Sequence, residues 1–162
     1  MLSERESFIG YAVQAIDAKG RVALPTALRG PMETNSGSRA LYIDQHEDGS
    51  CLVAFDRGWI QLRRDQIARD EAFERSQGRD FDLAMARRIP FVTAEPVPFD
   101  LSGRFVLPPF LRDLAGLADE AFFSGVFDYV EIWNPSDVLS SPRMPDRAKR
   151  YVEWHLAQKA KR

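Results

Sequence analysis

The sequence predicts an α+β fold with a mainly β core that is built from two copies of one unit. The stretch DAKGRVALPTALR at residues 17–29 returns as DLSGRFVLPPFLR at residues 100–112, with seven of thirteen positions identical. Short apolar segments typical of strands flank both copies, and a charged segment of helical character separates them. Chance rarely produces such a match, so we interpret it as tandem duplication of a supersecondary unit. The identical pairs, all 83 residues apart, are Asp17/Asp100, Gly20/Gly103, Arg21/Arg104, Leu24/Leu107, Pro25/Pro108, Leu28/Leu111 and Arg29/Arg112.

The first unit begins with a strand and a tight turn. Residues 1–7 are short and polar, and we expect them to be frayed, whereas the loose alternation at 8–16 predicts a strand. A turn follows, because Asp17 can accept hydrogen bonds from nearby backbone amides and Gly20 can adopt a positive φ. The continuously apolar residues 22–24 predict a strand that is buried on both faces or packs against a second copy.

A short helix and a hairpin complete each unit. Pro25 is a typical first residue of a helix and Gly30 a typical end, and the second copy repeats this at 108–116. The offset between the copies is 83 at the motif but 78 at the last strand, where Phe55 matches Trp133. The first unit therefore holds five extra residues, for which the polar stretches 33–38 and 44–50 have room. The expected hairpin strands are 40–43 and 51–55 in the first unit, and 121–125 and 129–133 in the second.

Helices are expected between the units and after the second one. Apolar spacing in 59–89 predicts a helical segment with a second helix at 80–88, and we interpret its mixed charges as a solvated face rather than a binding surface. Residues 94–98 contain two prolines and are expected to be an extended linker. A final amphipathic helix is predicted at 146–162. The basic residues at its end can interact with the negative end of the helix dipole or with a nucleic acid, and the sequence favours neither interpretation over the other.

Composition narrows the class of protein. The 162 residues are 44% hydrophobic and 28% charged, values typical of a globular chain. No apolar run is long enough to span a membrane and no signal peptide is recognisable, so we expect a cytoplasmic protein. Cys51 stands alone, which excludes an internal disulfide, and with only His46 and His155 beside it a zinc cluster is not expected. Cys51 lies in an apolar run, and we expect a small buried strand residue rather than a reactive thiol.

The sequence lacks the motifs of common enzymes. It contains no GxGxxG, GxxxxGK[ST] or GxSxG, and neither histidine lies near a plausible nucleophile in the sequence. We therefore expect a protein that is not an enzyme and needs no cofactor. The net charge of −2 gives no direct support for nucleic-acid binding, so any such function must depend on local charge.

The repeated Asp-x-x-Gly-Arg turn is the candidate functional feature. Its carboxylate and guanidinium can simply stiffen the turn, or the stiff turn can present basic side chains to phosphates and base edges. Residues 17–29 carry a local balance of +2, whereas 100–113 carry zero, with Ser102 in the position of Lys19. The candidate DNA-binding residues are Lys19, Arg21, Arg29 and Arg104, and the candidate structural turn residues are Asp17, Gly20, Asp100 and Gly103.

The duplicated motif resembles the MraZ family of bacterial transcriptional regulators. Further matching features are Phe8-Ile9-Gly10, Arg87-Arg88, the segment RDLAGL at 112–117 and VEIWNP at 130–135, so that the resemblance covers residues 8–138. The family usually has Phe-Arg-Gly near its start, where this chain has Ile9 in the arginine position. The resemblance implies SpoVT-AbrB-type domains at 11–58 and 94–137, a helical connector at 59–93, and a C-terminal loop and helix at 138–162.

The resemblance also implies architecture and function. The two units would be interleaved swapped hairpins in a pseudo-twofold, double-psi-like barrel. The protein would form a ring-like homo-oligomer, associate with the nucleoid and bind repeats in promoter DNA upstream of its division and cell-wall gene cluster, repressing it. Paired Asp and Arg map onto Asp17 and Arg21, and onto Asp100 and Arg104. The alternative hypothesis is a ring scaffold without enzymatic activity whose main partner is a protein, and the acidic overall balance favours it slightly.

Overall fold

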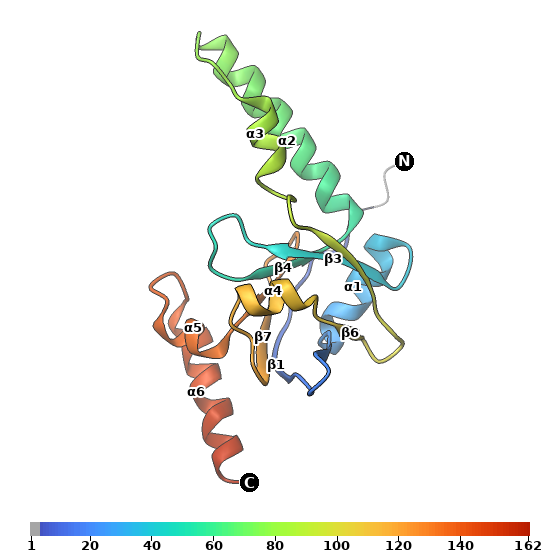
Figure 1. Ribbon diagram of the computed structural model, residues 1–162, viewed down its shortest axis with the longest axis vertical. Coiled ribbons are helices and arrows are strands. Elements are labelled where there is room, and N and C mark those ends of the chain that lie inside the picture. The colour runs from blue at the N-terminus through green and yellow to red at the C-terminus, as the bar shows by residue number, and fades with distance from the viewer. Residues whose placement is uncertain (1–3) are drawn as a thin grey trace.

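The computed structural model describes residues 4–162 and shows an α+β fold (Figure 1). Each repeat contributes four strands and one helix to the core. The first repeat comprises β1 (Tyr11–Ala15), β2 (Arg21–Ala23), α1 (Thr26–Ser36), β3 (Ala40–Gln45) and β4 (Leu52–Phe55). The second comprises β5 (Glu95–Pro98), β6 (Arg104–Val106), α4 (Pro109–Leu114), β7 (Glu120–Gly125) and β8 (Val130–Trp133). The connector contains α2 (Arg57–Ser76) and α3 (Leu83–Arg88), and the chain ends with α5 (Pro135–Ser140) and α6 (Asp146–Ala160).

The strands of the two repeats are interleaved within one antiparallel sheet. Its six strands lie in the order β1-β7-β8-β4-β3-β5, while β2 and β6 form a separate two-stranded ribbon. The first strand of each repeat thus pairs with the third strand of the other repeat. The described strands form no closed barrel, which differs from the double-psi-like barrel that the resemblance implies. Interleaving explains why neither repeat could complete its sheet without the other.

The strand registers reveal a pseudo-twofold relationship between the repeats. In the ribbon, Val22 lies opposite its own counterpart Phe105. In the sheet, Val53 of β4 lies opposite its counterpart Glu131 of β8. A twofold axis generates antiparallel strand pairs in which equivalent residues lie opposite each other. The pseudo-twofold axis therefore passes through both of these residue pairs.

The extra residues of the first repeat are divided between two places. Ala15 lies opposite Glu120, and the equivalent Pro98 lies opposite Ala40, so the third strands are offset by 80 residues rather than 83. Three extra residues therefore precede β3, where α1 has 11 residues and α4 has six. The remaining two lie in the β3–β4 hairpin, which brings the offset to 78 at the fourth strands. The structure thus confirms both predicted insertion regions.

The ribbon packs on the main core through one face only. Val22 and Phe105 are buried, whereas Val106 is 51% exposed. The expectation that this strand is buried on both faces is therefore wrong. The other interpretation of the continuously apolar residues, packing against a second copy, is the one that the structure shows, because β2 pairs with β6, its second copy.

The two edges of the six-stranded sheet are protected by different means. Residues 94–98 were expected to be a linker, but β5 forms an edge strand, where its two prolines are tolerated because the outer side of an edge needs no donors. At the other edge, the backbone N–H of Val13 donates to Tyr151 Oη of α6 over 3.2 Å. The C-terminal helix thereby occupies a backbone group that would otherwise be free to pair with another chain.

A second apolar cluster lies under the C-terminal helices. Cys51 is buried there, as expected, and burial raises the pKa of its thiol. This cluster fastens α5 and α6 to the face of the sheet opposite the main core. Its buried members are Val13, Cys51, Phe122, Trp133, Val138 and Val152.

The N-terminal segment is held against the core. Residues 1–3 lie outside the described part of the chain, but Arg5 forms ion pairs with Asp56 over 2.6 Å and with Asp128 over 3.0 Å. Asp56 also caps α2 by accepting a hydrogen bond from the Trp59 amide. The expectation that residues 4–7 are frayed is therefore wrong, because an arginine in this polar segment meets a buried carboxylate.

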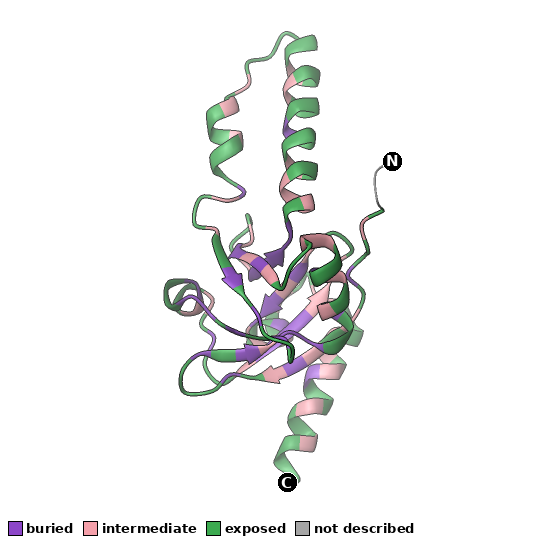
Figure 2. Ribbon diagram, turned by 90° about the vertical axis from the view of Figure 1, so that its right-hand side faces the viewer, coloured by how far each residue is buried: buried purple, intermediate pink, exposed green. Residues whose placement is uncertain are grey.

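The connector helices project away from the sheet as an arm, which confirms their predicted helical character (Figures 1 and 2). Ile67 is the only buried residue of α2. Ion pairs such as Glu71–Arg75 and Arg79–Glu74 lie along the arm, as expected for a solvated face. None of the helices within residues 4–162 is long and apolar enough to cross a membrane.

Candidate nucleic-acid interface

The turn at residues 17–20 is organised by a single carboxylate. Asp17 Oδ1 accepts hydrogen bonds from the backbone amides of Lys19 and Arg21, each over 2.9 Å. Asp17 Oδ2 accepts from Arg21 Nε over 2.6 Å. Gly20 completes the turn with φ of 80°, a conformation that a residue with a β-carbon adopts only at a cost. The carboxylate therefore fixes both the loop backbone and the base of the arginine side chain.

The second turn repeats this arrangement atom for atom. Asp100 Oδ1 accepts from the amides of Ser102 and Arg104, and its Oδ2 accepts from Arg104 Nε over 3.0 Å. Gly103 has φ of 79°. These bonds lower the pKa of Asp100, and the hydrogen bond from the Arg104 amide lowers it the most. The pKa of Asp17 is lowered in the same way, first by the Arg21 amide and then by its guanidinium.

Each turn is bonded to the strand of the other repeat. The Leu107 amide donates to the carbonyl of Gly20 over 2.9 Å, and the Leu24 amide donates to the carbonyl of Gly103 over 2.8 Å. These bonds extend the ribbon at both of its ends. Because both turns share one ribbon, they cannot move independently of each other.

Arg29 and Arg112 support the turns reciprocally. Arg29 Nε donates to the carbonyl of Leu24 over 2.7 Å, and its side chain lies against Gly103 of the second turn. Arg112 Nε donates to the carbonyl of Leu117, and its Nη1 lies beside Gly20 of the first turn. Arg29 is thus half-buried and structurally engaged. Its predicted contact with DNA would have to use its Nη groups.

The outer face of the ribbon presents two arginines. Arg21 lies opposite Val106, and Ala23 lies opposite Arg104, so all four side chains point to the same side. The side chains of Arg21 and Arg104 are 51% and 61% exposed. Diagonal neighbours of this kind lie about 7–8 Å apart, and their β-carbons are somewhat closer. Within the described residues, only the Nε of each guanidinium has a hydrogen-bond partner, so the Nη groups face solvent.

The two turn tips differ in chemistry. In the first, Lys19 is exposed, and no ion pair joins it to another residue of the described chain. In the second, Ser102 takes its place, and the neighbouring Leu101 is 81% exposed. The structure therefore places Arg21 and Arg104 on one face of the ribbon, with the exposed Lys19 at the tip of the first turn and the exposed Leu101 at the tip of the second.

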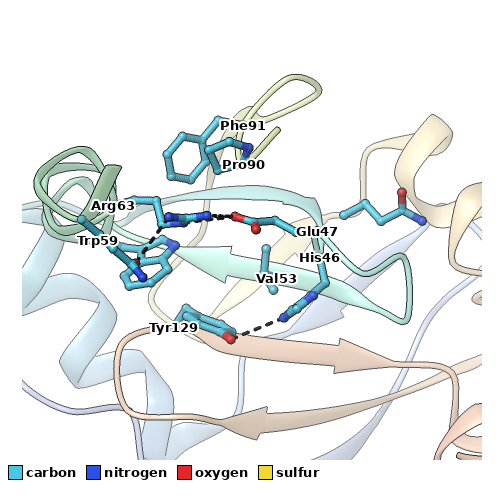
Figure 3. A pocket seen from close by; sticks show the side chains of 10 residues that line it. His46, Glu47, Val53, Trp59, Arg63, Pro90, Phe91 and Tyr129 are labelled. Carbon is cyan, nitrogen blue, oxygen red and sulfur yellow. Dashed lines mark hydrogen bonds and ion pairs between the residues drawn. The ribbon is translucent and has the colours of Figure 1, made fainter. Parts of the chain in front are cut away.

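A pocket of about 240 Å³ lies at the base of the arm, and sequence patterns did not point to it (Figure 3). His46 contacts Tyr129 Oη over 3.4 Å, and Arg63 is paired with Glu47 over 2.7 Å. Burial raises the pKa of Tyr129 to about 12. No serine, threonine, cysteine or lysine of the described chain lines this pocket. Among residues 4–162, no three His, Cys, Asp or Glu side chains are grouped so as to hold a metal ion.

Comparison with known proteins identifies relatives over most of the chain. The Transcriptional regulator MraZ of Thermomicrobium roseum is 35% identical over 130 residues, which covers 80% of this chain and 83% of the relative. The protein of the same name from Syntrophobacter fumaroxidans is also 35% identical over 130 residues, covering 80% of each chain. That of Burkholderia ambifaria is 29% identical over 151 residues, covering 90% of this chain and 99% of the relative. No family model matches the sequence.

Proposed function

Because the chain belongs to the MraZ family of transcriptional regulators, we propose that it binds double-stranded DNA through the outer face of the β2–β6 ribbon. The observation that carries the proposal is the fixed, exposed arginine pair, Arg21 and Arg104. Their aspartate partners hold each Nε, which leaves the Nη groups free to donate to phosphate oxygens or to guanine O6 and N7. A side chain that is already held in place loses less entropy on binding than a free one.

The first turn is the stronger contact in this proposal. Lys19 adds a mobile cation beside Arg21, and a lysine can follow a phosphate as a point charge. Arg29 would contact DNA through its Nη groups, which have no hydrogen-bond partner within the described residues. Arg104 contributes from the second turn, while Asp17, Gly20, Asp100 and Gly103 keep the two turns in shape.

Self-association would compensate for the acidic overall charge. The net charge of −2 disfavours binding by a single protomer. A ring-like homo-oligomer would present several ribbons to spaced DNA repeats, and linked contacts can raise avidity by roughly 10²–10⁴-fold. Exposed apolar side chains on the arm support such assembly, notably Phe73 at 59%, Ile89 at 49% and Met85 at 47% exposure.

The biological setting that we propose follows the family. The target would be promoter repeats upstream of the protein's own division and cell-wall gene cluster, and binding would repress it from a cytoplasmic, nucleoid-associated location. The interleaved pairing of β1 with β7 and of β5 with β3 supports two swapped-hairpin, SpoVT-AbrB-type domains at 11–58 and 94–137. In this proposal the protein is not an enzyme.

A band-shift titration with the DNA upstream of the gene tests the proposal. Arg21→Ala should weaken binding by roughly 5- to 150-fold, because a charge-assisted bidentate contact contributes about 1–3 kcal/mol. Arg69→Ala removes one exposed arginine from the arm and serves as the matched control. Equal affinity of Arg21→Ala and wild type, at equal oligomer mass, would exclude the ribbon as the DNA contact.

The second candidate function is a ring scaffold whose main partner is a protein. The net charge of −2 favours it, because an acidic surface repels DNA. A pull-down that retains a protein partner independently of salt, together with no retention on the upstream DNA, would establish this alternative.

A further inference from the structure

The C-terminal helix carries a basic stripe on one side. We define the basic stripe as Arg147, Arg150 and Trp154 of α6 and Lys161, the residue directly after it, which recur at intervals of three, four and seven residues and therefore share one side of the helix. All four are exposed, Trp154 at 59%. The acidic residues of the helix, Asp146 and Glu153, lie four residues before and three residues after Arg150, so they flank the stripe on one side. Neither forms an ion pair within the described residues. The stripe itself combines three cations and one aromatic ring.

The cations of the stripe are not neutralised by the rest of the described chain. Each ion pair within residues 4–162 that involves α6 uses a residue outside the stripe. His155 Nε2 lies 2.8 Å from Glu120, and Lys159 lies 3.1 Å from the same carboxylate. The helix therefore uses different side chains for attachment to the sheet and for its solvent-facing charge.

The attachment points determine the direction of the stripe. Tyr151 Oη accepts from the Val13 amide in β1, and four and eight residues later His155 and Lys159 meet Glu120, which lies opposite Ala15 at the end of β1. The helix therefore runs alongside β1 in the direction of the first turn, and its C-terminal end projects beyond the sheet (Figure 1). The carbonyl of Asp119 accepts from the Ile16 amide, immediately before Asp17. Lys161 thus lies at the same end of the molecule as Lys19.

A groove with aromatic walls lies between the stripe and the edge strand. Tyr11, Tyr151 and Trp154 line it together with Arg147 and Arg150. The rings of Tyr11 and Tyr151 pack edge to face at 4.7 Å. Tyr11 is 60% exposed. The groove therefore offers flat apolar surface beside two guanidinium groups.

We propose that the basic stripe of α6 binds the phosphate backbone of the same DNA duplex that the first turn contacts. This inference rests on the proposed function. From Arg147 to Lys161 the stripe extends about 21 Å at 1.5 Å per residue, and duplex DNA presents phosphates continuously over such a length. An anionic membrane surface would favour a wide apolar face beside the cations, whereas the stripe has one aromatic ring. The cations of the stripe, which are unpaired within the described residues, and the position of Lys161 at the same end of the molecule as the first turn favour DNA.

The salt dependence of DNA binding separates this inference from the proposed function. Each lost phosphate contact should reduce the slope of log affinity against log salt by about 0.9. The triple variant Arg147→Ala, Arg150→Ala, Lys161→Ala should therefore have a slope smaller by about 2–3 for each protomer that engages the DNA. Lys149→Ala, which changes a partly exposed lysine outside the stripe on the same helix, is the matched control and should leave the slope unchanged. A lysine variant, Arg147→Lys with Arg150→Lys, should retain the wild-type slope because the charge is kept.

The outcomes are distinguishable. A wild-type protein that does not bind the upstream DNA would overturn the proposed function and this inference together. Wild-type binding that Arg21→Ala weakens, with an unchanged slope in the triple variant, would overturn this inference alone. Loss of binding to vesicles of anionic lipid in the triple variant, with an unchanged DNA slope, would also overturn it, in favour of a membrane surface.

Discussion

Arg29 of the first repeat lies so close to Gly103 of the second that a β-carbon at Gly103 would come within 2.3 Å of Arg29 Nε. The same β-carbon would lie 2.8 Å from the carbonyl oxygen of Leu24, which is backbone and cannot move aside cheaply. The counterpart contact is looser, because a β-carbon at Gly20 would lie 3.3 Å from Arg112 Nη1, the end of a flexible side chain. The two turns match in hydrogen bonding but differ in how tightly the opposite repeat covers them.

This asymmetry predicts unequal effects of two equivalent substitutions. Gly20→Ala and Gly103→Ala both place a β-carbon at positive φ, which costs about 1–2 kcal/mol. Gly103→Ala should cost more than that, because it also displaces Arg29 and presses on the Leu24 carbonyl. Urea unfolding of the two variants measures the difference. An equal or smaller loss of stability for Gly103→Ala would contradict the described contact.

The turn carboxylates predict a dependence of stability on pH. The pKa values of Asp17 and Asp100 are below their ordinary value of 3.8, so their contribution to stability is full above that pH and is lost as pH falls through the lowered values. The double variant Asp17→Asn, Asp100→Asn should therefore be less stable than wild type near neutral pH, and the difference should shrink in acid. Urea unfolding of wild type and the double variant, near neutral pH and in acid, tests this. A difference that does not change with pH would show that the charge of these carboxylates is not involved.

The arm predicts where self-association can be disrupted. Phe73→Ser together with Ile89→Ser should lower the mass of the oligomer, because both side chains are exposed and apolar and would lose buried area at an interface. Leu101→Ser, which alters an exposed apolar residue on the second turn, is the control. Light scattering after size exclusion measures the mass. If the arm variant keeps the wild-type mass, the oligomer does not form through these residues.

The hydrogen bond between Tyr151 and Val13 predicts local protection of the sheet edge. Tyr151→Phe removes the acceptor of the Val13 amide and should destabilise the protein by about 0.5–1.5 kcal/mol. Hydrogen exchange of the Val13 amide should accelerate, while that of Ile43, on a strand that is paired on both sides, should follow only the change in global stability. Unchanged exchange at Val13 would mean that the contact does not protect this edge.

The repeat made much of the fold accessible from sequence. Because Asp17, Gly20 and Arg21 recur at one offset, the hydrogen-bonded turn could be predicted. The decrease of the offset from 83 to 78 indicated that the first repeat contains extra residues, and the polar stretches indicated where they lie. Partners of the strands could not be predicted, since an apolar pattern indicates which face is buried but not which strand lies alongside. For that reason 94–98 was expected to be a linker although it pairs with β3.

Side-chain contacts between distant segments could not be predicted from the sequence either. Arg29 was expected to face DNA, and nothing in its own segment indicates that Gly103 lies beneath it. Likewise, Arg5 lies in a polar terminus, and only the folded chain brings it to Asp56. The basic end of α6 was recognisable, whereas its position at the same end of the molecule as the first turn depends on the contacts with Val13 and Glu120.

The most direct test of the central claim is a salt titration of binding to the upstream DNA by wild type, Arg21→Ala and the control Arg69→Ala, at equal oligomer mass. If the ribbon contacts DNA, wild type and the control should share a steep decrease of affinity with salt, and Arg21→Ala should bind more weakly with a slope smaller by about 0.9 per engaged protomer. Identical affinities and slopes for all three proteins would contradict the assignment of Arg21, and with it the ribbon, as the DNA-binding surface.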